Sequence, residues 1–96
     1  MYSYLLEELS KAIGARLLIK FNYNNKSYTV EPHLIGKNNN NEDCLCAWEI
    51  NHQEEQWRCF MLKDIRNLAI LEEHFFKQRP GYDPYDSSMS RIYYRI

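Results

Sequence analysis

The sequence predicts a small, mostly β domain with one N-terminal helix, arranged as a small SH3- or Sm-like β-barrel with a C-terminal extension. One segment has helical periodicity, and about five short segments with strand periodicity follow it at regular spacing, as in such barrels. The chain has 96 residues, which fits one domain with one core. Two Trp, eight Tyr and four Phe supply the large apolar area that so short a chain requires.

The first predicted elements are a helix and a β-hairpin. Apolar residues at helical spacing predict the helix: Leu5, Leu6, Leu9, Ala12 and Ile13. Gly14 follows them and is expected just past the helix end. From Leu17 the apolar period changes to two, and Asn24-Asn25 predicts a two-residue turn because Asn tolerates a positive φ. The second strand of this hairpin is expected to end at Pro32, which lacks a backbone donor for the ladder.

The middle of the chain predicts a second hairpin and one further strand. Residues 36–41 are expected to form a polar loop, and residues 44–50 and 56–62 two strands around a turn at 52–55. Residues 65–71 predict a last short strand. The predicted core is drawn from the apolar residues of these segments: Leu9, Ile13, Ile19, Phe21, Val30, Leu45, Phe60, Leu62 and Ile65.

Residues 1–74 are the predicted barrel domain, and residues 75–96 are a C-terminal extension. Two prolines and a glycine early in the extension require an extended or turned backbone there. Residues 91–96 have a strand-like composition but no following element to pair with, so they either pack back on the barrel or meet a neighbouring molecule. We predict an ordered extension that contributes to a homodimer, because Tyr93 and Tyr94 give aromatic faces beside an unpaired strand edge.

Charge, cysteine content and hydropathy narrow the class of protein. Twelve Lys and Arg against thirteen Asp and Glu give a net charge of −1, so no overall positive field points to nucleic acid. The first residues lack a cationic leader, and no apolar run approaches the roughly 20 residues of a membrane helix. Three cysteines are an odd number in a chain with no export signal, which indicates a reducing compartment. We therefore expect a cytoplasmic protein with no membrane association.

Two residues are candidates for binding an anionic ligand. Arg58 lies on a predicted strand between Trp57 and Cys59, where a guanidinium can clamp phosphate or carboxylate and aromatics can stack on bases. The alternative is that Arg58 pairs with one of the acids nearby in sequence. His33 could bond a phosphate when protonated. The alternative for His33 is a surface or half-buried histidine without a ligand.

The sequence predicts neither a metal site nor an enzyme. Cys44, Cys46 and Cys59 with a His could hold zinc, but a C-x-C pair with one distant Cys lacks the usual knuckle spacing. Buried free Cys also behaves as a small apolar residue. The sequence contains no Gly-rich phosphate loop, nucleophile motif or spaced His pair. We expect a binding protein with no catalytic residue, metal or cofactor.

Several motifs, in order and with similar gaps, resemble the WYL domain family. A helix and hairpin lead to Val30-Glu31-Pro32-His33, then come Leu45-Cys46-Ala47-Trp48 and Arg58-Cys59-Phe60-Met61-Leu62-Lys63-Asp64-Ile65. The family pattern has a hairpin that ends in Val-Glu-Pro and a later Arg-x-Phe segment, and this sequence has both. The resemblance covers roughly Leu5 to Leu71. Because the domain and its extension use all 96 residues, we expect a standalone, divergent member without the usual helix-turn-helix partner domain.

The resemblance implies an Sm-like barrel that senses a ligand in bacterial regulators, in transcription regulation or phage defence. It also implies a basic patch for nucleic acid or nucleotides that includes Arg58, near which Arg16 and Lys20 add charge in the sequence. Three basic positions of the family hold other residues here: Tyr28, Met61 and Asp64. The namesake tripeptide corresponds to Asp43-Cys44-Leu45, which keeps only the leucine.

We therefore expect a regulatory module that binds a small anionic ligand, either a nucleotide or a short single-stranded nucleic acid. The expected ligand-binding residues are Arg58, Arg16, Lys20 and His33. So few cations predict weak, strongly salt-dependent binding to oligonucleotides. The alternative is a protein-interaction or self-association module with no small ligand, which an intermolecular strand at residues 91–96 would favour.

Overall fold

The elements follow one another as a helix, two pairs of adjacent strands and two further strands. The computed structural model describes residues 3–50, 55–75, 77, 79–86 and 88–96. The elements are α1 (Ser3–Ala15), β1 (Leu17–Tyr23), β2 (Lys26–Asn38), β3 (Asp43–Glu49), β4 (Gln56–Met61), the short 3₁₀-helix η1 (Leu62–Asp64), β5 (Ile65–His74) and β6 (Met89–Arg95). The predicted turn at residues 52–55 falls, except for its last residue, outside the described residues.

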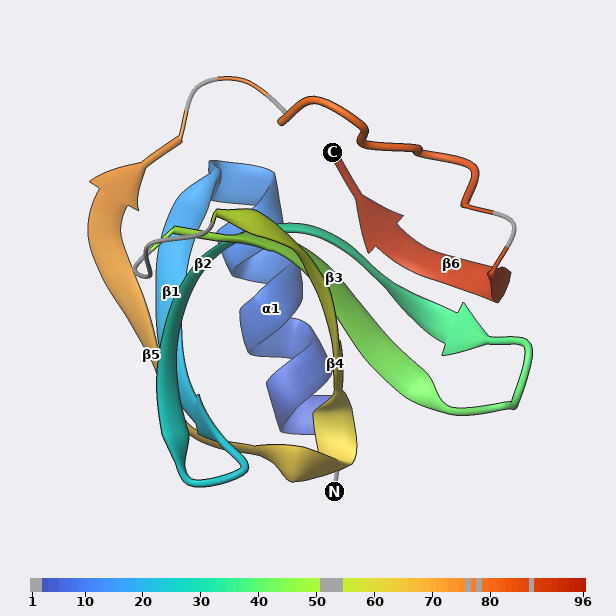
Figure 1. Ribbon diagram of the computed structural model, residues 1–96, viewed down its shortest axis with the longest axis horizontal. Coiled ribbons are helices and arrows are strands. Elements are labelled where there is room, and N and C mark those ends of the chain that lie inside the picture. The colour runs from blue at the N-terminus through green and yellow to red at the C-terminus, as the bar shows by residue number, and fades with distance from the viewer. Residues whose placement is uncertain (1–2, 51–54, 76, 78, 87) are drawn as a thin grey trace.

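The strands form one antiparallel sheet that curves around α1 (Figure 1). Their order is β4-β3-β2-β1-β5, and β6 pairs with β2 beside this path. The predicted class, mostly β with one N-terminal helix, is therefore confirmed. Among the described residues β4 and β5 remain the two ends of the path, so the sheet is open and closure into a barrel stays a prediction.

Strand β2 is shared between two partners along one edge. Its first part, from Lys26 to Val30, pairs with β1, and its last part, from Leu34 to Asn38, pairs with β6. The ladder with β3 spans both parts. The extension therefore docks on its own chain, which was one of the two outcomes expected for residues 91–96.

The first hairpin forms as predicted. Asn24 and Asn25 have φ angles of 51° and 63°, the left-handed values that a two-residue hairpin turn requires. Tyr23 and Lys26 pair on either side of the turn. The match confirms that these two asparagines set the register of β1 and β2.

The helix end differs from the prediction. Gly14 lies inside α1, which continues to Ala15, and Arg16 takes the left-handed φ of 56° instead. A Cβ on Gly14 would lie 2.8 Å from the hydroxyl oxygen of Tyr94 on β6. Gly14 leaves room for the end of the Tyr94 side chain, and it does not end the helix.

The predicted end of β2 is also wrong, because the strand runs through Pro32 to Asn38. Pro32 lies after the last residue paired with β1 and before the first paired with β6, so its missing donor falls where that edge has no partner. The expected polar loop at 36–41 shrinks to a turn after Asn38. A Cβ on Gly36 would lie 2.3 Å from the carbonyl oxygen of Arg91, so this glycine allows β6 to pair here.

The core lies between α1 and the concave face of the sheet. All nine predicted core residues are buried, with exposed fractions of 6% or less. Four aromatic rings fill one end of it: Phe21, Tyr23, Tyr28 and Phe60. No helix in the described part of the chain is long and apolar enough to span a bilayer.

Candidate functional site

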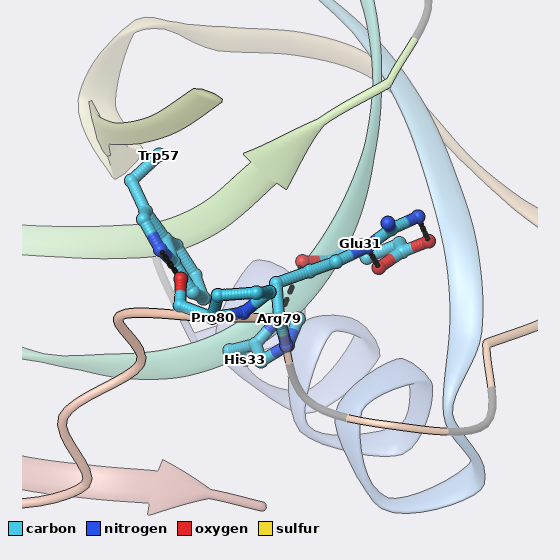
Figure 2. A network of polar contacts seen from close by, with 5 residues as sticks. All are labelled: Glu31, His33, Trp57, Arg79 and Pro80. Atoms are coloured by element: carbon cyan, nitrogen blue, oxygen red, sulfur yellow. Dashed lines mark hydrogen bonds and ion pairs between the residues drawn. The ribbon is translucent and has the colours of Figure 1, made fainter. Parts of the chain in front are cut away.

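The extension is held against the sheet by a cluster that we call the tail clamp, made of Glu31, His33, Trp57, Arg79 and Pro80 (Figure 2). Glu31 and His33 come from the stretch of β2 that lies between its two edge partners. The ladder with β3 shifts register between Pro32 and Leu34, so His33 sits at an irregularity of the strand. At this irregularity the His33 ring points toward the extension.

The ring of His33 is fully buried and bonded at both nitrogens. Nδ1 lies 2.8 Å from the carbonyl oxygen of Glu31, and Nε2 lies 3.2 Å from the backbone nitrogen of Arg79. A backbone N–H only donates, so Nε2 accepts and Nδ1 carries the proton. The ring also stacks on Phe75, with centroids 5.0 Å apart, and meets Trp57 edge-on at 4.8 Å. His33 is therefore held as one neutral tautomer.

Arg79 joins the extension to Glu31 through two parallel hydrogen bonds. Nε donates to Oε1 at 2.7 Å and Nη2 donates to Oε2 at 2.8 Å. The hydrogen bond to the Glu31 side chain raises the pKa of Arg79. The guanidinium also lies over the Trp48 ring, 5.5 Å from its centroid. Glu31 is 5% exposed, so this fork neutralises a buried carboxylate.

Trp57 and the C-terminal residues complete the attachment. The Trp57 indole N–H donates to the Pro80 carbonyl at 2.7 Å (Figure 2). The Tyr82 ring stacks on the indole, with centroids 5.9 Å apart. The Tyr82 hydroxyl donates to the Ile96 carbonyl at 3.1 Å, and the Ile96 N–H donates to the His33 carbonyl at 3.1 Å. The extension is thus bonded to the sheet at Arg79, Pro80 and Ile96.

We expect the neutral state of His33 to make the fold less stable in acid. Burial lowers the pKa of His33 below its ordinary 6.5. The unfolded chain therefore takes up a proton first as the pH falls, and stability is lost below about pH 6.5 and retained above it. Between pH 7.5 and 5.5 the loss from this group is at most about 1.4 kcal/mol. Chemical denaturation of the chain and of His33→Asn at both pH values measures it.

The His33→Asn variant is the control, because its amide can still donate to the Glu31 carbonyl but does not titrate. Carboxylates change the stability of both proteins with pH by the same amount, so their effect cancels when the two losses of stability are subtracted. Equal loss of stability in acid for the two proteins would contradict a neutral, buried His33.

The four residues predicted to bind a ligand do not form one patch. Arg58 pairs through Nε with the buried Glu49 and lies over the Tyr28 ring. Lys20 is exposed on β1, while Arg58 is on β4, with β2 and β3 between them. Arg16 lies at the turn from α1 into β1, near enough to His33 to contribute to the lowering of its pKa. The ion pair that was left open as the alternative for Arg58 is present, and His33 is buried more completely than expected.

A polar hollow lies at the opposite end of β1, with a volume of about 740 Å³. It is formed by the β1–β2 turn and by the segment that leads into β5. The lining includes cations, one acid, and amide and hydroxyl groups: Lys26, Arg66, Asp64, Asn22, Asn24, Asn25, Asn67 and Ser27. Asn67, like the two turn asparagines, has a positive φ of 55°. Sequence reasoning found the turn but missed the hollow, because Arg66 and Asn67 reach it only through the pairing of β5 with β1.

Arg66 is fixed at the rim of this hollow. Its Nη1 donates to the carbonyl oxygens of Lys63 at 2.6 Å and Ile65 at 3.1 Å. Among the described residues, its other guanidinium nitrogens have no hydrogen-bond partner. Arg66 pairs across strands with Asn22, and Lys20 lies two residues from Asn22 on the same face of β1. Three cations therefore lie on or beside the hollow: Lys20, Lys26 and Arg66.

No set of three His, Cys, Asp or Glu side chains within the described ranges is arranged to hold a metal ion. No family model, curated protein or solved structure matches the chain. The resemblance to the WYL family therefore stays a prediction from the motifs.

Proposed function

We propose that this chain is a binding module for a small anionic ligand, such as a nucleotide or a short stretch of single-stranded nucleic acid, at the polar hollow. The observation that carries the proposal is the meeting of Lys26, Arg66 and four asparagine side chains at one cavity. Lys, Arg and Asn side chains are among those that bond phosphate and sugar groups. The volume is also within the range of small-molecule sites.

The resemblance to the WYL family supports the same class of ligand. A regulatory role in bacterial transcription or phage defence belongs to this proposal and rests on the resemblance. A cytoplasmic location and a lack of catalysis are part of the same proposal and rest on the cysteine content and on the motifs of the sequence. The curvature of the sheet around α1 supports a fold of SH3 or Sm type. Lys20 is the one predicted ligand-binding residue that lies beside the hollow.

Self-association remains the second candidate function. Strand β6 uses one edge for β2, and Tyr94 on β6 is 43% exposed. A homodimer of two chains that each keep β6 on their own β2 would use the other edge of β6.

Binding at the hollow is expected to be weak and to fall steeply with salt. Two or three cations that each neutralise a phosphate give a slope of about −1.4 to −2.1 in log affinity against log salt on single strands. Titration of a labelled short oligonucleotide and of a nucleoside triphosphate at low and moderate salt measures this slope. Lys26→Ala with Arg66→Ala should weaken binding roughly tenfold.

Two variants locate the site. Asp64→Asn removes the one acid of the hollow and should tighten binding by roughly two- to fivefold, a gain that misfolding cannot produce. Arg58→Ala should leave binding unchanged if the hollow is the site. A loss of binding in Arg58→Ala with no change in the Lys26 and Arg66 variant would move the site to Arg58. Binding that persists at moderate salt would contradict a site of so few cations.

A further inference from the structure

Two cysteine thiols face each other across β3 and β4 on the convex face of the sheet. Cys46 and Cys59 are direct partners in the antiparallel ladder, and their Sγ atoms lie 3.2 Å apart. Cys46 is buried, whereas Cys59, on the last strand of the path, is exposed. One sulfur is therefore open to reagents, and the other lies directly behind it.

The backbone already has the spacing of a disulfide. Directly opposed residues in an antiparallel ladder have Cα atoms about 4.5–5.5 Å apart, within the roughly 4.4–6.8 Å that disulfides span. The sulfurs need to approach by only about 1 Å to bond. Side-chain rotation can supply this movement, so the strands need not separate.

A cavity of about 280 Å³ gives small molecules access to both sulfurs. It lies between the sheet and the extension, and both cysteines line it together with Trp57, Tyr82, Asp83 and Asp86. This space is several times the roughly 30 Å³ that a water molecule occupies in the liquid. A peroxide molecule therefore fits this space.

We propose that Cys46 and Cys59 form a peroxide-sensitive dithiol that closes into a reversible disulfide between β3 and β4. This modification site is separate from the polar hollow and does not depend on the anion-binding proposal.

Cys59 is the thiol that reacts first. A hydrogen bond from the Cys46 thiol lowers the pKa of Cys59 to about 7, so much of it is thiolate at neutral pH. The same hydrogen bond, with burial, holds the pKa of Cys46 well above its ordinary value. Cys46 therefore stays protonated until Cys59 has been oxidised, and it then becomes the resolving thiol.

The reaction has two steps and balances with one molecule of hydrogen peroxide. The Cys59 thiolate attacks a peroxide oxygen: an S–O bond forms, the O–O bond breaks, and the leaving hydroxide takes a proton to become water. Cys46 then loses its proton and attacks the Cys59 sulfur, so the S–S bond forms and the S–O bond breaks. The second hydroxide leaves as water. Two thiols and one peroxide thus give one disulfide and two waters.

Cys44 provides an internal comparison. Burial raises its pKa to about 11, and its Sγ lies 3.7 Å from Sδ of Met89 on β6. It has neither the thiolate character nor the exposure of Cys59. Peroxide should therefore leave Cys44 reduced while the other two thiols are consumed.

The test is to treat the full chain with one equivalent of hydrogen peroxide and to count free thiols after denaturation. We expect a loss of two of the three thiols and an intact mass lower by two hydrogen atoms. Trypsin should then release residues 38–58 joined to residues 59–63, and a reducing agent should restore all three thiols. Cys44→Ser should keep this linkage, which assigns it to Cys46 because residues 38–58 contain both cysteines.

Cys46→Ser provides the opposite variant and should accumulate oxygen on Cys59 in place of the disulfide. Should that variant fail to fold, the thiol count and peptide map of Cys44→Ser alone decide the question. A gain of oxygen without a linkage in the unsubstituted chain would overturn the proposal. So would linkage between two chains, or loss of the linkage in Cys44→Ser.

Discussion

Replacing Phe60 with alanine is expected to lower the free energy of unfolding by about 3–5 kcal/mol. Phe60 is 2% exposed and packs edge-on against three other rings, with centroids at 4.9 Å from Phe21, 5.0 Å from Tyr23 and 5.1 Å from Tyr28. The truncation removes buried apolar surface, leaves a cavity and breaks all three aromatic contacts. Stability of a domain this size is typically about 5–15 kcal/mol, so the substitution should remove a large part of the total.

Urea denaturation followed by Trp fluorescence measures this loss. Tyr4→Ala is the matched control, because Tyr4 is an aromatic residue that is 71% exposed. Its substitution should change stability by no more than about 0.5 kcal/mol. A loss below about 1 kcal/mol for Phe60→Ala would mean that the four-ring cluster does not support the core.

Replacing Arg79 with alanine is expected to cost about 2–3 kcal/mol, because it leaves the buried carboxylate of Glu31 without its two guanidinium donors. The cost is expected below the roughly 3–5 kcal/mol of a fully buried pair, since water reaches the Arg79 side chain, which is 35% exposed. Residues 79–82 should also leave the sheet, which would expose Trp57. Denaturation curves and the fluorescence of the native state report these two effects separately.

A double-mutant cycle with Glu31→Gln separates charge from packing. In the Glu31→Gln background no carboxylate remains at this position. Arg79→Ala should therefore lower the free energy of unfolding by at least about 1 kcal/mol less than it does in the unsubstituted chain. Arg91→Ala is a control for net charge within the extension, because Arg91 is exposed and its guanidinium lies over the Tyr93 ring, 5.6 Å from the centroid. The same loss from Arg79→Ala in both backgrounds would show that the fork to Glu31 adds nothing beyond packing.

Local signals in the sequence were enough to predict most elements. The turn at Asn24-Asn25 and the alternation from Leu17 gave the first hairpin, and helical spacing gave the buried face of α1. These signals work because they involve neighbours in the chain. The predictions at Pro32 and Gly14 were wrong because both residues are placed by contacts with β6, which is distant in sequence. Strand β2 continues past Pro32 to pair with β6, and Gly14 lies against Tyr94 of β6.

The candidate sites were harder to predict for the same reason. Arg79 meets Glu31 across 48 positions of sequence, and nothing local marks either residue as a partner of the other. Lys20 was singled out for its charge, but Arg66 joins it only through the pairing of β1 with β5. The two strands that carry Cys46 and Cys59 were predicted, but the direct pairing of these cysteines was not. It depends on the register of β3 against β4, which the composition of the two strands does not determine.

We expect β2 to fold in two stages. Its first part is joined to β1 by a two-residue turn, whereas its last part pairs with residues more than half of the chain away. Closing so long a loop costs more conformational entropy, so the hairpin forms early and β6 is added late. Until then Leu34 to Asn38 present an open strand edge, and residues 89–95 of a second copy fit it as well as those of the same chain. We therefore expect refolding at high protein concentration to favour exchange of extensions between molecules. The product is a domain-swapped dimer with the native contacts of the monomer.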